Sequence, residues 1–144
     1  IDTGPGFKKD EAREVWNKRA RDTGDRFDRE GLDMLKSLSP ERASVTHRNA
    51  RGLALAARGM LAQRDARVIE SLPDIKVPSL VVVGADDTPF LAASDYMAAK
   101  IPGAQKAVIP NAGHAVNIDQ PQPFIDAVLP FLDGLEAGAP GKTG

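Results

Sequence analysis

The side chains best suited to proton transfer in this sequence are one imidazole and one carboxylate in two short polar segments. His114 lies in NAGHAVNIDQP, directly after Gly113, and the segment GADD ends with Asp86 and Asp87. An imidazole exchanges protons near physiological pH, and a carboxylate bonded to its Nδ1–H fixes the tautomer, so that the other ring nitrogen can act as a base. The alternatives are a loop histidine exposed to water and a turn or helix-capping role for either aspartate.

Each polar segment follows a run that is typical of a short buried strand. Ser79–Val83 (SLVVV) and Gln105–Ile109 (QKAVI) are rich in β-branched and aliphatic residues, as strands of a parallel sheet are. Helices are expected over residues 89–101 and 123–132, which gives a strand–helix–strand–helix order and predicts an α/β fold. Because ligands bind outside the carboxyl ends of parallel strands, both polar segments are expected at one edge of the sheet, within reach of each other.

The front half of the chain is expected to be helical. Trp16, Ala20 and Phe27 fall on one face of a predicted helix over residues 9–38, which the glycines within it could break or kink. A second helix is predicted over residues 40–64, because Ser-Pro-Glu at its start is typical of a helix N-terminus.

Composition excludes several classes of function. The 144 residues include 42% hydrophobic and 27% charged residues, with a net charge of −1, so a packed core is expected and nothing favours nucleic acid or an anionic membrane as a partner. Without cysteine, the chain has no disulfide, zinc–thiolate site or cysteine nucleophile. The two histidines lack metal-binding spacing, so no metal site is predicted.

Targeting signals are likewise missing from the sequence as given. No apolar run approaches the ~18 residues of a membrane span, and IDTGPGFKKD lacks the apolar stretch of a signal peptide. We therefore expect a cytoplasmic location, although the chain does not begin with methionine and residue 1 need not be the natural start.

Two stretches, VPSLVVVGADDTPF and QKAVIPNAGHAVNIDQP, resemble the C-terminal end of the α/β-hydrolase fold. Gly84 and Asp87 match the family's G-x-x-D element, which implies that Asp87 is the acid of a catalytic triad. Gly113 and His114 match its G-H element, which implies that His114 is the base. Asp119 stands where the family usually has a structural glutamate. The resemblance implies the C-terminal part of a hydrolase parallel sheet, preceded by a helical cap.

This resemblance also implies a domain organisation. Residues 1–72 would form the helical cap region and residues 73–132 the last two strand–helix units of the hydrolase core. The Gly-rich residues 133–144 are expected to be a disordered tail.

One departure from the family's pattern decides what the chain can do alone. The family's nucleophile lies in a G-x-S-x-G turn, and none of the six serines in this sequence has such a setting. We therefore expect the chain to be a C-terminal portion, inactive by itself, whose nucleophile and oxyanion donors belong to a missing N-terminal half of the same fold.

Three hypotheses about function follow. The first is a cofactor-free hydrolase of an ester, lactone, amide, epoxide or related small molecule. The second is a non-catalytic module, or inactive remnant, that binds a small ligand on the same scaffold. The third retains the fold with a different reaction, such as that of cofactor-free dioxygenases, haloperoxidase-like proteins or C–C bond hydrolases, because fold alone does not fix the reaction.

Overall fold

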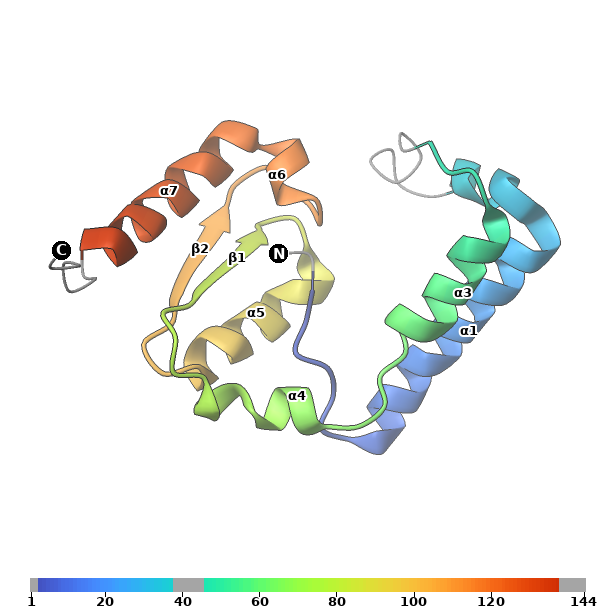
Figure 1. Cartoon of the computed structure of the whole chain (residues 1–144), viewed down its shortest axis with the longest axis horizontal. Helices are drawn as coiled ribbons and strands as arrows, with labels where there is room; N and C mark the ends of the chain where they lie inside the picture. Colours follow the sequence, from blue (N-terminus) through green and yellow to red (C-terminus); the bar gives the residue numbers. More distant parts are fainter. Residues whose placement is uncertain (1–2, 38–45, 138–144) are drawn as a thin grey trace, which may run out of the picture. The chain divides into compact units, whose positions relative to one another are not determined.

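A computed structural model describes residues 3–37 and 46–137 of the chain. The chain divides into two compact units (Figure 1). One unit is Gly6–Glu70, and the other joins the first five residues to Ser71 and all that follows. The predicted boundary after residue 72 and the observed division after Glu70 therefore differ by two residues.

The first unit consists mainly of two long helices. Helix α1 spans Asp10–Glu30 and continues into a 3-10 helix, η1, over Gly31–Ser37. Gly31 ends α1 because its φ of +62° lies in the left-handed region, which glycine adopts without the clash of a Cβ. Helix α3 spans Ala50–Met60, and a short α4 spans Arg67–Glu70.

Helix α3 is shorter than the helix predicted over residues 40–64. Residues 46–49 are not helical, and the side chain of Asn49 accepts a hydrogen bond from the N–H of Gly52 at 3.2 Å, so that Asn49 is the N-cap. The Ser-Pro-Glu start at residues 39–41 lies outside the described residues.

Close packing of α1 against α3 forms the core of this unit. Phe27, Met34 and Ala54 are buried together. Gly24 is what permits the close approach, since a Cβ there would stand 2.8 Å from Nε of Arg58 and 3.1 Å from the carbonyl oxygen of Ala54. Arg58 then reaches two carboxylates of α1, those of Asp25 and Asp28, each at 2.6 Å.

The second unit contains the parallel pair of strands. A 3-10 turn, η2 (Leu72–Asp74), precedes β1 (Leu80–Gly84), α5 (Thr88–Lys100), β2 (Gln105–Ile109), α6 (Val116–Asp119) and α7 (Pro121–Ala137). Strands β1 and β2 are parallel, with Val82 opposite Ala107 and Gly84 opposite Ile109. The predicted α/β order and the parallel pairing are both present.

The two long helices of this unit cover opposite faces of the strand pair (Figure 1). Val82 and Ala107 pack with Phe124 of α7 around a buried cluster of Ile109, Ala112 and Val116. On the other face, Lys106 of β2 forms an ion pair with Asp95 of α5. The strand pair thus lies between two helices, as in layered α/β folds, with an apolar cluster on the α7 side.

The last helix is longer than predicted. Helix α7 runs to Ala137, five residues beyond the predicted end at Leu132, so that the first part of the predicted tail is helical; residues 138–144 lie outside the described range. Gly134 lies within this helix and does not have the positive φ of a glycine that ends a helix. Within the ranges that the structure describes, no helix is both long and apolar enough to cross a membrane.

Candidate active site

The turn after β1 presents Asp87 at the start of α5. The N–H of Asp87 donates to the carbonyl of Gly84 at 3.1 Å, which closes a tight turn, and Asp87 is the N-cap position of α5. Its side chain does not cap the helix and is only 9% exposed. A buried carboxylate requires a polar partner, because burying an unpaired charge is costly. Asp86, the alternative considered from the sequence, is exposed.

The loop after β2 carries His114 and is held by two side chains that come after it. Asn111 begins the loop with a φ of +54°, a left-handed conformation that asparagine tolerates better than most residues. Nε2 of Gln120 donates to the carbonyl oxygen of Asn111 at 3.1 Å. Oδ2 of Asp119 accepts the N–H of Gly113 at 2.8 Å, so Asp119 is bonded to the residue directly before His114.

The two loops are joined directly by their backbones. The N–H of Ala85 donates to the carbonyl of Ile109 at 2.8 Å, and that of Asp86 donates to the carbonyl of Ala112 at 2.9 Å. Gly84 makes this approach possible, because a Cβ there would stand 2.2 Å from the carbonyl oxygens of both Ala112 and Gly113. The separation of the two polar segments is therefore set by main-chain groups.

Asp87 and His114 meet in this arrangement. Nδ1 of His114 lies 2.9 Å from Oδ2 of Asp87, an ordinary hydrogen-bond distance. An ionised carboxylate can only accept, so Nδ1 carries the proton and Nε2 of the neutral ring is the nitrogen that can take another. The imidazole is 25% exposed. A half-buried base oriented by a buried acid is the arrangement of general-base catalysis.

The sequence argument missed the side chains that surround this pair. The ring of Phe90 packs against that of His114, with centroids 4.6 Å apart and planes at 44°. Together with Asp87, these two rings line a cavity of about 10 Å³, to which Thr3 and Ser94 also contribute. Neither the ring contact nor the Gln120 bond has a local sequence signal, because both depend on how the loops fold. By contrast, Gly84, Gly113 and Asp119 lie where the sequence placed them, around the predicted pair.

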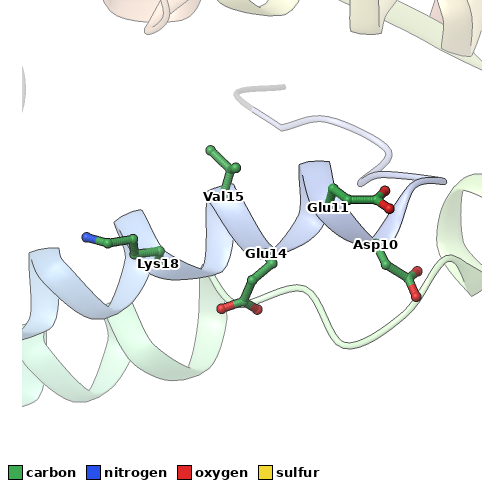
Figure 2. Close-up of a pocket in the computed structure, with 5 residues that line it drawn as sticks. All are labelled: Asp10, Glu11, Glu14, Val15 and Lys18. Carbon is green, nitrogen blue, oxygen red and sulfur yellow. The ribbon is translucent and has the colours of Figure 1, made fainter.

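Outside this site, the surface of the helical unit has a shallow feature among the described residues. A shallow depression on α1 is lined by Asp10, Glu11, Glu14, Val15 and Lys18 (Figure 2), all of them on one exposed helix surface without buried polar groups. Across residues 3–37 and 46–137, no group of three or more histidines and carboxylates could hold a metal ion.

Comparison with known proteins assigns the family. Residues 3–127 match the alpha/beta hydrolase family, and the chain belongs to it. The match includes both the helical unit and most of the strand unit.

Individual relatives agree with this assignment. A Bacillus subtilis protein with the provisional name 2-succinyl-6-hydroxy-2,4-cyclohexadiene-1-carboxylate synthase is 29% identical over 94 residues, which are 65% of this chain and 34% of that protein. The structure of MenH from S. aureus has a TM-score of 0.82 at 21% identity and covers 94% of this chain and 57% of that one. A thermophilic esterase from Thermogutta terrifontis has a TM-score of 0.75 at 28% identity and covers 93% and 54%.

These relatives are considerably longer than the chain. The sequence spans about a third of the curated relative and somewhat more than half of each of the two solved chains. The chain therefore covers only part of the hydrolase fold, which is consistent with its resemblance to the C-terminal portion.

Proposed function

We propose that the protein containing this chain is a hydrolase of small molecules, of the esterase or lactonase type, in which His114 is the general base and Asp87 orients it. The observation that carries the proposal is the 2.9 Å contact between Nδ1 of His114 and Oδ2 of a buried Asp87. Membership of the alpha/beta hydrolase family and similarity to an esterase support the reaction class.

The proposed mechanism divides the work between the two loops. Asp87 holds the neutral tautomer with the proton on Nδ1. Nε2 removes the proton of a serine nucleophile as it attacks the substrate or, where the nucleophile is an aspartate carboxylate, the proton of the water that hydrolyses the covalent intermediate. The imidazolium that forms is stabilised by the Asp87 carboxylate. The nucleophile is a serine or aspartate from the portion of the fold that this sequence does not include. The helical unit Gly6–Glu70 is proposed as the cap that sets specificity.

The test compares two neighbouring aspartates in the whole protein. Hydrolysis of p-nitrophenyl esters, lactones and epoxides is measured for D87N, H114Q and the control D86N. We expect D87N and H114Q to lower kcat by about 10⁴-fold, while D86N retains activity because Asp86 is exposed and outside the pair. Equal activity of D87N and D86N would refute the assignment of the acid.

A second candidate reaction comes from the B. subtilis relative. Its 29% identity to this chain favours including the formation of 2-succinyl-6-hydroxy-2,4-cyclohexadiene-1-carboxylate in the same substrate panel. If this product forms only when His114 is present and no ester is hydrolysed, the proposal of a hydrolase would be wrong and the protein would be a synthase that uses the same site. Ligand binding without turnover of any substrate would favour the non-catalytic hypothesis.

A further inference from the structure

Two side chains from the first turn of α5 contact the same imidazole. The N–H of Phe90 donates to the carbonyl of Asp87 at 2.9 Å, which places the two residues one helical turn apart. The carboxylate of Asp87 lies at Nδ1 of His114, and the phenyl ring lies against the imidazole ring with centroids 4.6 Å apart. One helix end therefore contacts both the edge of the imidazole and its ring.

The two contacts constrain different motions of the ring. A hydrogen bond holds Nδ1 near its partner, but hydrogen bonds tolerate a spread of angles and the χ2 torsion of histidine has broad minima, so the ring plane can still tilt without losing the bond. A packed aromatic ring restricts that rotation, because aromatic pairs prefer defined tilted or offset geometries. The observed angle between the planes is 44°. Only when the plane is fixed does Nε2 point in one direction.

Phe90 also has a neighbour early in the chain. The backbone of Gly4 lies against it, since a Cβ on Gly4 would stand 3.6 Å from Cε1 of Phe90 and 3.8 Å from Cβ of Ala93. Phe90 is half-buried and lines the small cavity that also contains Asp87 and His114. The phenyl ring therefore has both the Gly4 segment and the imidazole as near neighbours.

We propose that Phe90 is a positioning residue: it fixes the plane of the His114 imidazole and thereby aims Nε2 at the proton that is removed. This inference rests on the proposed function in one respect, because the reaction sets the direction in which Nε2 must point. The effect on the ring itself does not depend on any reaction, so the two proposals can fail separately.

The first measurement is NMR spectroscopy of the His114 ring. This chain has two histidines, and H114Q identifies the resonances of His114 in the whole protein by their loss. The variants are F90L, which removes the ring, and F90Y, which retains it. The control is F124L, the same change at a phenylalanine that packs against the Ile109 cluster instead. We expect F90L to lose the ring-current shift of the imidazole protons and to exchange the Nδ1 proton with water faster, while F90Y and F124L behave as wild type.

The second measurement is steady-state kinetics of the whole protein. We expect F90L to lower kcat by up to about 100-fold, the effect of misplacing a reacting group by about 1 Å, with little change in KM, and F90Y to restore it. An unchanged Nδ1–H exchange rate in F90L, or a rise in KM alone, would overturn the proposal and make Phe90 a wall of the pocket. If H114Q retains full hydrolysis, the proposed function fails, whereas the exchange rate still decides whether Phe90 fixes the ring.

Discussion

Replacing Gly84 by alanine is expected to separate the two loops that carry Asp87 and His114. The added Cβ would stand 2.2 Å from the carbonyl oxygens of Ala112 and Gly113, where ordinary contact needs more than 3 Å. Both obstacles are backbone atoms, so no side chain can rotate away. The loops must move apart by about 1 Å, and the two backbone hydrogen bonds that join them, from Ala85 and Asp86, are weakened or lost.

The expected magnitude follows from these terms. Overpacking costs about 1–3 kcal/mol, and each of the two hydrogen bonds contributes about 0.5–1.5 kcal/mol, so G84A should lower the free energy of unfolding by about 2–6 kcal/mol. The assay is urea unfolding followed by circular dichroism. The matched control is G134A in the same unit, because Gly134 is an exposed residue of α7 with nothing within 4 Å of its added Cβ.

The control is expected to change stability in the opposite direction. Alanine is preferred over glycine in a helix by about 1 kcal/mol, so G134A should be slightly more stable than wild type. If G84A unfolds at the same urea concentration as G134A and retains the Nδ1–H signal of His114, then main-chain docking of the two loops does not hold the acid and base together.

Substitutions at two further positions test other contacts. Hydrogen bonding to Arg58 lowers the pKa of Asp25 below its ordinary value of 3.8, so the pair of Arg58 with Asp25 stabilises the fold at pH values above about 4 and loses this effect as the pH falls through the lowered pKa. We expect R58M to be less stable than wild type at pH 7 and the difference to shrink below pH 4 in pH-dependent urea unfolding. Asp119 accepts the N–H of Gly113, and an asparagine carbonyl can do the same, so D119N should retain stability whereas D119A should lose about 1–3 kcal/mol, and equal losses in thermal unfolding would contradict this role.

The strands were predictable because their signals are local. Gln105–Ile109 was predicted with the bounds that β2 has, and β1 is displaced by one residue from the predicted Ser79–Val83. Aliphatic β-branched residues between turn-forming residues favour short buried strands whatever surrounds them. The G-x-x-D and G-H elements follow the strands directly, so predicting the strands also predicted which side chains would meet at their ends.

The remaining features depend on contacts between distant residues. One helix was predicted over residues 40–64, whereas residues 46–49 are not helical and α3 begins after Asn49, because a single N-cap residue is a weak local pattern. The end of α7 was predicted too early because the Gly-rich composition of residues 133–144 favours an irregular tail, although the helix continues to Ala137. Phe90 gave no signal, since an apolar residue on a helix is usually core, and only the fold brings its ring to His114.

The docking of the two loops also bears on how many sequences could build the same site. The hydrogen bonds between them use the N–H groups of Ala85 and Asp86 and the carbonyls of Ile109 and Ala112, which every residue except proline can supply. Within limits of size, the side chains at positions 85 and 86 can therefore vary without changing the distance between Asp87 and His114. Substitutions around the pair can then change its surroundings while its own geometry is retained.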